Sequence, residues 1–128
     1  KYVPLYGDAP TPEETLPELA EARAPHLPIS VMLLGMGADM HTASIFPGAD
    51  QLDLALHGKD RMVAMRAPGA LEPRITLSTS VIKGALNRHL VIIGTEKRAA
   101  LEAARHLSPE EAPVAAVLPG TTVHWAET

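Results

Sequence analysis

Residues 29–34, ISVMLL, form a short and nearly continuous apolar run that ends at a glycine-rich turn. Pro25 and Pro28 prevent the preceding chain from continuing as a helix, and a run of this length is typical of a strand buried on both faces of a sheet. A second such run, residues 90–93, also ends at a glycine and precedes an amphipathic helix. Strand, turn and helix in repeated succession predict an α/β fold with a mainly parallel sheet.

The remaining elements are expected to alternate in the same way along the chain. A helix should begin after Thr11, whose hydroxyl can cap it, and end near residue 24. Further strands are expected at residues 62–65, 74–77 and 122–125, and further helices at residues 42–46, 78–86, 96–106 and 113–118, while residues 48–60 are expected to be irregular. Aromatic residues make up 3% of the chain, which favours helices packed closely on a sheet over a β-sandwich.

Length, charge and cysteine content narrow the classes of function. The chain has 128 residues, of which 46% are hydrophobic, enough for one compact core. Its net charge of -4 provides no positive field to attract nucleic acid. The absence of cysteine excludes a disulfide framework, a thiol nucleophile and a thiolate metal site. No apolar run approaches the ~20 residues that span a bilayer, and no histidine pair has metal-ligand spacing. We therefore expect a cytoplasmic protein that uses no membrane anchor, metal or cofactor.

The segment with the clearest chemical potential is residues 35–48, GMGADMHTASIFPG, directly after the first predicted strand. Ligands of open α/β sheets bind beyond the carboxyl ends of the strands, where a glycine-rich turn lets the backbone approach them. The segment lacks the third glycine of the dinucleotide fingerprint, so it does not predict an NAD site. A neutral imidazole at His41 could deprotonate an attacking water, and Asp39 could orient the ring or the water.

The complete segment resembles GxGxDGHTASLFPG of the 6-phosphogluconolactonases. The shared positions are Gly35, Gly37, Asp39, His41, Thr42, Ala43, Ser44, Phe46, Pro47 and Gly48. The similarity continues in the family's order through PRIT at residues 73–76, GTEKRAAL at residues 94–101, PVAAVL at residues 113–118 and VHW at residues 123–125. It extends over nearly all of this chain but only about the carboxy-terminal half of the family's pattern. We therefore expect residues 1–128 to be the carboxy-terminal part of a single domain.

This resemblance implies a fold, a reaction and a set of site residues. The implied fold is a three-layer α/β sandwich like that of the ribose-phosphate isomerases and glucosamine-phosphate deaminases. The implied reaction is hydrolysis of 6-phosphogluconolactone in the pentose phosphate pathway, with His41 as general base. Arg74 and Lys97 are the implied ligands of the substrate phosphate. Gly35 and Gly37 are expected to contact the substrate, and the backbone N–H groups of their turn could stabilise the oxyanion.

One departure from the family's pattern affects the site directly. Met40 stands where the family has glycine, immediately before His41. A glycine adopts positive φ freely, whereas Met must avoid that region or be strained there. Two other functions stay open. One is a glucosamine-6-phosphate deaminase, although that group continues as HIAFNEPG where this chain has HTASIFPG. The other, which Met40 raises, is a catalytically silent sugar-phosphate-binding domain.

Each candidate residue also has a structural alternative. Asp39 could simply accept backbone N–H bonds within its turn, and Arg74 could form a salt bridge across the sheet. Lys97 lies in the first turn of a predicted helix, an unfavourable place for a cation unless an anion also binds there. Thr42 and Ser44 are expected to support the turn rather than act as nucleophiles. At the N-terminus of the helix predicted at residues 42–46, the helix dipole should keep the His41 imidazole neutral.

Overall fold

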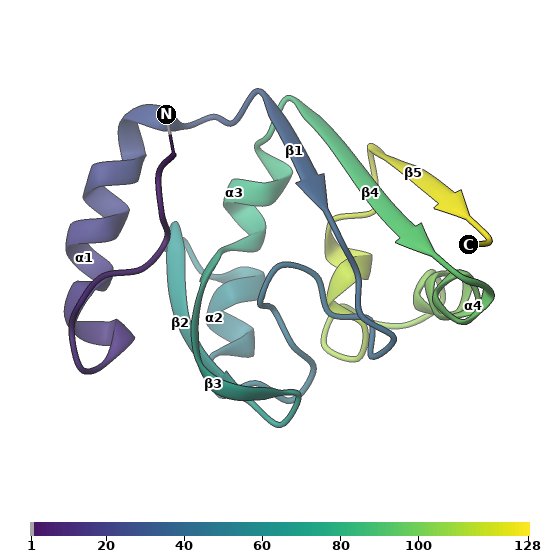
Figure 1. Ribbon diagram of the computed structural model, residues 1–128, viewed down its shortest axis with the longest axis horizontal. Helices are drawn as coiled ribbons and strands as arrows, with labels where there is room; N and C mark the ends of the chain where they lie inside the picture. The colour runs from purple at the N-terminus through teal and green to yellow at the C-terminus, as the bar shows by residue number, and fades with distance from the viewer. Residues whose placement is uncertain (1) are drawn as a thin grey trace.

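The computed structural model describes residues 2–128, in which helices and strands alternate along the chain (Figure 1). The strands are β1 (Val31–Leu34), β2 (Met62–Ala67), β3 (Ala70–Leu77), β4 (Asn87–Ile93) and β5 (Thr121–Ala126). The helices are α1 (Pro12–Arg23), α2 (Leu52–His57), α3 (Thr79–Lys83) and α4 (Thr95–Ala104), with two 3-10 turns, η1 (Ala24–His26) and η2 (Pro113–Ala116).

The main sheet contains three parallel strands in the order β1-β4-β5. Val31 pairs with Asn87 and Arg88 pairs with Thr121 at the start of the two ladders. Figure 1 shows the three arrows pointing the same way, so the turns that follow β1 and β4 lie at the same edge of the sheet. The predicted α/β fold with a mainly parallel sheet is confirmed.

The core lies against one face of this sheet. Side chains at alternate strand positions point into it, together with residues of α2, α3 and α4, the β2–β3 hairpin and η2. The sheet and α4 contribute Met32, Leu34, Leu90, Ile92, Leu101 and Ala104 to one continuous apolar cluster. The opposite face is bare in residues 2–128, since the side chain of Leu33 is 71% exposed and those of Val31 and Ile93 are also exposed. The expectation that β1 is buried on both faces was therefore wrong for these residues.

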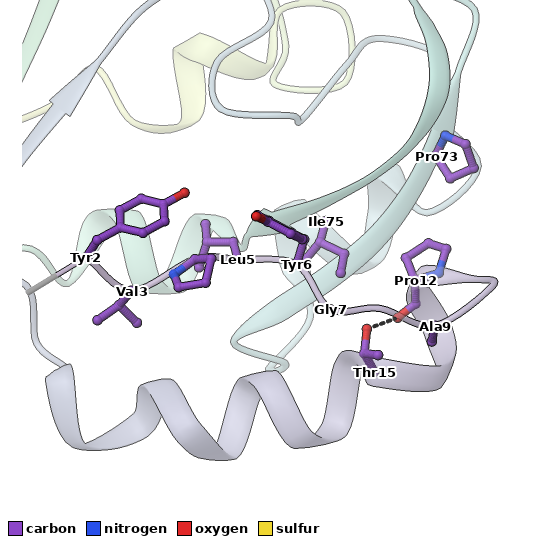
Figure 2. Close-up of a pocket in the computed structure, with 11 residues that line it drawn as sticks. Tyr2, Val3, Leu5, Tyr6, Gly7, Ala9, Pro12, Thr15, Pro73 and Ile75 are labelled. Atoms are coloured by element: carbon purple, nitrogen blue, oxygen red, sulfur yellow. Dashed lines mark hydrogen bonds between the residues drawn. The ribbon is translucent and has the colours of Figure 1, made fainter.

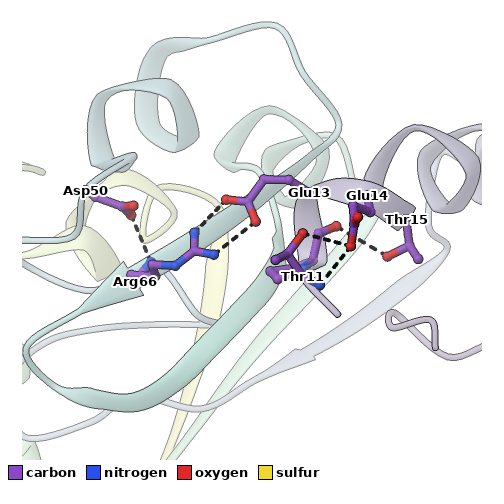
Figure 3. Close-up of polar contacts among 7 residues, drawn as sticks. Thr11, Glu13, Glu14, Thr15, Asp50 and Arg66 are labelled. Atoms are coloured by element: carbon purple, nitrogen blue, oxygen red, sulfur yellow. Dashed lines mark hydrogen bonds and ion pairs between the residues drawn. The ribbon is translucent and has the colours of Figure 1, made fainter. Parts of the chain in front are cut away.

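A second sheet is the antiparallel hairpin of β2 and β3. Four consecutive residues of β2 are buried, and the register shifts between Met65 and Ala67. An ion pair joins the hairpin to α1, because the guanidinium of Arg66 donates to both carboxylate oxygens of Glu13 at 2.5 and 3.0 Å. The backbone N–H of Arg66 also donates to Asp50 at 2.8 Å (Figure 3). The hairpin is thus fastened both to α1 and to the turn before α2.

Two local predictions were wrong. Residues 42–46 form no helix; they make a tight turn closed by an isolated antiparallel bridge between Thr42 and Ile45. Residues 48–60, expected to be irregular, contain α2, whose inward face buries Ala55 and Leu56. Both segments are short, and the apolar pattern of four to six residues does not distinguish a helical turn from other compact turns.

Candidate active site

The loop after β1 is held by hydrogen bonds between residues close in sequence. The hydroxyl of Thr42, which is fully buried, donates to the carbonyl of Gly35 at 2.8 Å. The N–H of Gly37 donates to the carbonyl of His41 at 3.0 Å, and the N–H of Met40 donates to the carbonyl of Gly37 at 2.9 Å. Thr42 therefore supports the turn as predicted. The N–H of Gly37 is already engaged within the loop, so the expected oxyanion role does not fit this donor.

His41 and Asp39 form the closest polar pair of the loop. The ring Nδ1 of His41 lies 2.5 Å from Oδ1 of Asp39, and the backbone N–H of His41 donates to the same oxygen at 3.1 Å. An ionised carboxylate only accepts hydrogen bonds, so the ring proton belongs on Nδ1 and Nε2 carries the free lone pair. The two structural roles considered for Asp39, orienting the ring and accepting a backbone N–H, are combined in one carboxylate.

The charge on Asp39 is favoured by this pair. Burial alone raises the pKa of Asp39, but the hydrogen bonds from the ring and backbone of His41 outweigh it and place the pKa below the ordinary value. Asp39 is therefore ionised at neutral pH and can stabilise an imidazolium that forms when Nε2 takes up a proton. The His41 side chain is 28% exposed, so its ring is accessible from solvent.

The two glycines of the turn have different surroundings. A Cβ at Gly37 would overlap the imidazole of His41 and come within 2.7 Å of Asp39 Oδ1. A Cβ at Gly35 would meet nothing within 4 Å. The absence of a side chain at Gly37 therefore makes room for the His41–Asp39 pair, whereas Gly35 faces open space where a ligand could approach the backbone.

Phe46 and Arg74 complete the group around the imidazole. The rings of His41 and Phe46 are stacked, with centroids 4.2 Å apart and planes inclined by 23°. The guanidinium carbon of Arg74 lies 5.8 Å from the centroid of the Phe46 ring. The guanidinium carbon of Arg74 therefore lies no farther from the centroid of the His41 ring than these two distances added together. Sequence reasoning gave Phe46 no role, although its place in the HTASIFPG string was the available signal.

Lys97 is placed at the same edge of the sheet, after the strand next to β1. It lies in the first turn of α4, which follows β4, and its side chain is half-buried. Within residues 2–128 we find no hydrogen bond or ion pair between Lys97 and His41, Asp39 or Arg74. The structure thus links Arg74 to His41 through the Phe46 ring and shows no such link for Lys97 among the described residues.

The backbone at Met40 takes the second of the two conformations considered for it, whereas His41 does not lie where it was predicted. Met40 has φ of 71°, so it adopts the left-handed conformation that glycine would enter without strain. His41 is not at a helix N-terminus, because residues 42–46 are a turn and α2 begins only at Leu52. The helix dipole argument for a neutral imidazole therefore does not apply, and the hydrogen bond to Asp39 is what fixes the tautomer of the ring.

Two cavities are candidate places for a ligand, and His41 lines neither of them. The smaller, about 270 Å³, is lined by Gly35, Ala43, Ser44 and Thr76 together with apolar residues of β1 and β3. The larger, about 640 Å³, lies between residues 2–12, α1 and β3, and includes none of the predicted site residues (Figure 2). The smaller cavity borders the open side of Gly35 and is the better candidate for ligand contact.

The residues that the structure describes contain no group of three His, Asp or Glu side chains arranged to hold a metal ion. Of the helices described, none has the length and apolar character needed to cross a membrane.

Comparison with known proteins identifies related sequences and structures. The family model described as glucosamine-6-phosphate isomerases/6-phosphogluconolactonase matches residues 2–125. A 6-phosphogluconolactonase of Pseudomonas aeruginosa is 40% identical over 98% of this chain and 55% of its own length. One of Rhizobium meliloti is 37% identical over 98% of this chain and 58% of its own length. This chain thus spans somewhat more than half the length of these relatives.

Solved structures give the same picture. A 6-phosphogluconolactonase from Shewanella baltica superposes with a TM-score of 0.90 at 31% identity, over 94% of this chain and 55% of that one. A 6-phosphogluconolactonase from Thermotoga maritima has a TM-score of 0.70 at 26% identity, over 88% of this chain and 50% of that one. The arrangement of strands and helices described above is therefore shared with larger proteins.

Proposed function

Because this chain belongs to the glucosamine-6-phosphate isomerase/6-phosphogluconolactonase family, we propose that it is part of an enzyme that hydrolyses 6-phospho-D-glucono-1,5-lactone to 6-phosphogluconate. The observation that carries the proposal is the imidazole of His41, whose Nδ1 contacts Asp39 and whose Nε2 is free to accept a proton. A small phosphorylated sugar lactone is the proposed partner, and the cytoplasm, where such a metabolite is used, is the proposed location.

The chemistry assigned to His41 and Asp39 is general-base hydrolysis. Nε2 of His41 removes a proton from water as the water oxygen attacks the lactone carbonyl carbon. Asp39 stabilises the resulting imidazolium through the Nδ1 proton. The tetrahedral intermediate then expels the ring oxygen, which takes the proton back from Nε2, and the product is the open-chain acid. This step needs no metal ion to proceed.

Arg74 and Lys97 are the proposed cations for the substrate phosphate. Arg74 is supported by its place near the Phe46 ring, which also stacks on His41, and its planar guanidinium suits a phosphate. Lys97 is supported by its place in the first turn of α4 at the same sheet edge, where backbone N–H groups also favour an anion. Gly35 is proposed to contact the sugar through its open side, and Gly37 to act through the space it gives His41.

We also propose that residues 1–128 are the carboxy-terminal part of a single domain. The support is the length ratio to the relatives and the bare apolar face of the main sheet. On this proposal Leu33→Thr should leave the free energy of unfolding of residues 1–128 nearly unchanged. The same change in a chain of the relatives' full length should lower it by about 2 kcal/mol, because there the side chain is buried.

The test is a measurement of acid release from freshly made 6-phosphogluconolactone above its spontaneous rate. In the complete enzyme, His41→Ala should reduce turnover by at least ~100-fold, the usual contribution of a general base. His106→Ala, which changes an exposed histidine just beyond α4, is the matched control and should retain it. Near-normal turnover by His41→Ala would refute the assignment.

The same preparation distinguishes the two other functions. Ammonia release from glucosamine-6-phosphate would indicate a deaminase. Binding of 6-phosphogluconate without turnover of either substrate would indicate a silent binding domain, the alternative raised by Met40 in place of the family's glycine.

A further inference from the structure

We propose that Phe46 is a positioning residue for the reaction, because a single fixed ring contacts both the general base and the phosphate-binding cation. This inference rests on the proposed function for its kinetic consequences. Its geometric content concerns the ring of Phe46, the imidazole of His41 and the guanidinium of Arg74.

Phe46 is buried without belonging to the main core. Its exposed fraction is 4%, yet it is not part of the continuous apolar cluster that the sheet, helices and hairpin form. Two of its neighbours belong to the candidate site: the stacked ring of His41 at 4.2 Å between centroids and the guanidinium of Arg74 at 5.8 Å.

The ring of Phe46 is held from the hairpin side. The turn between β2 and β3 approaches so closely that a Cβ at Gly69 would lie 3.2 Å from the Phe46 ring and 3.2 Å from Asp39 Oδ2. The carbonyl of Phe46 also accepts a hydrogen bond from Ala49 at 3.2 Å. Phe46 and the Asp39 carboxylate are therefore positioned by the same hairpin turn.

Stacking on Phe46 restricts the tilt of the His41 ring, which the hydrogen bond to Asp39 alone does not fix. A hydrogen bond at Nδ1 fixes one point of the imidazole, and a flat aromatic surface beneath it fixes the plane. Together they keep Nδ1 on Asp39 and Nε2 toward solvent. Arg74 lies on an exposed part of β3, and contact with the same ring limits how far its guanidinium can move from the base.

Phe46→Leu removes the aromatic face while keeping an apolar side chain, and Ile45→Val, in a fully buried neighbour, is the matched control. Phe46→Leu should reduce kcat about tenfold, the upper end of what an aromatic pair contributes, and should raise KM because Arg74 loses its support. In the double variant with Arg74→Met, the two increases in KM should be less than multiplicative. Ile45→Val should change neither constant.

A second measurement is independent of turnover. In the unmodified chain, the ring protons of His41 should be shifted upfield in the NMR spectrum relative to those of His26, His57 and His106, because they lie over the Phe46 ring; His89 and His124 are left out of the comparison because their rings stack on each other. The ring 15N shifts should report a proton on Nδ1 alone, and Phe46→Leu should give a mixture of the two tautomers. Unshifted His41 protons, or a Phe46→Leu variant that matches Ile45→Val in tautomer and kinetics, would overturn the inference. Loss of the proposed function would appear separately, as retained turnover in His41→Ala.

Discussion

Met40 combines a side chain that packs on the core with a backbone conformation suited to glycine. Its φ of 71° lies in the left-handed region, and its partly buried side chain contacts the apolar cluster. The carbonyl of Met40 also accepts the N–H of Val114 at 3.0 Å, so the conformation is fixed by a contact with a distant segment. The cost of the left-handed backbone and the benefit of side-chain burial therefore oppose each other at one position.

Met40→Gly and Met40→Ala separate these two effects. Both variants lose the thioether chain, but only glycine adopts positive φ freely, so Met40→Gly should be more stable than Met40→Ala by about 1 kcal/mol. Urea denaturation of the two variants measures the difference. As a control, Ala99→Gly at an exposed position inside α4 should lower stability by about 1 kcal/mol. Equal stability of the two Met40 variants would contradict the conformation described here.

Gly37 and Gly35 offer a second comparison. Gly37→Ala should displace the His41 ring from Asp39, because its Cβ would overlap the imidazole, and we expect a large loss of turnover with about 1 kcal/mol of stability lost. Gly35→Ala should leave the free energy of unfolding unchanged within ~0.5 kcal/mol, since its Cβ meets open space. Denaturant titration and lactone turnover distinguish the pair. A Gly37→Ala variant with intact turnover would show that the ring tolerates the added methyl group.

At this scale the sequence indicated candidate residues, whose roles stay predictions, but not how their side chains are arranged. The motif indicated His41 and Asp39, which the structure places in contact. The stacking of Phe46 on His41 could not be predicted, because it depends on how residues 42–46 turn and on the approach of the hairpin at Gly69. Both are tertiary effects that local pattern does not encode.

At the scale of elements, long patterns were informative and short ones were not. The helices α1 and α4 and the strands β1 and β4 were predicted within a few residues, because each has either a clear cap and periodicity or an apolar run. The turn at residues 42–46 and the helix α2 were missed, since each is six residues or fewer. For the candidate site this error mattered, because it had placed His41 at a helix end that does not exist.

The attachment of the hairpin to α1 gives a prediction at this scale. The hydrogen bonds from Arg66 lower the pKa of Glu13 and keep it ionised, but the pair is exposed, and salt screens such pairs. Glu13→Gln should lower Tm by about 1 °C at low salt and by less at high salt. Glu18→Gln, another exposed acid of α1, should show no such salt dependence. Thermal melts at two salt concentrations make the comparison.

In the whole molecule, one face of the main sheet is covered by the core and the other is exposed. The core fills the space between the main sheet, its helices and the hairpin, whereas the other sheet face presents Val31, Leu33 and Ile93 to solvent. The sequence predicted the parallel sheet but not this asymmetry. Alternate positions of β1 are equally apolar, so nothing in the strand's composition distinguishes the covered face from the bare one.

Stability of the whole chain should fall in acid. A hydrogen bond from Arg66 lowers the pKa of Glu13, and one from His57 lowers the pKa of Glu110. Burial raises the pKa of Asp39, but the hydrogen bonds from His41 outweigh it and lower that pKa. A carboxyl group whose pKa is lower in the folded state than in the unfolded state stabilises the folded state at any pH above its unfolded-state pKa. That contribution is lost as the pH falls through the folded-state pKa. Tm should therefore decline from about pH 5 downward.

Asp39→Asn is the matched variant for this acid dependence. It removes one of the three carboxyl groups whose pKa is lowered, so its Tm should fall less steeply below about pH 5 than that of the unmodified chain. Parallel acid dependence in the two proteins would show that Asp39 contributes nothing to the loss.

The indole of Trp125 gives this chain an intrinsic fluorescence signal near the start of α4. Its N–H donates to the carbonyl of Gly94 at 2.8 Å, and the guanidinium of Arg98 lies 4.5 Å from its ring. Gly94 and Arg98 flank Lys97 in sequence, and the chain has no other tryptophan. A phosphate that settles on the start of α4 will therefore alter the emission of a single fluorophore, and its affinity can be titrated without labelling the protein or turning over a substrate.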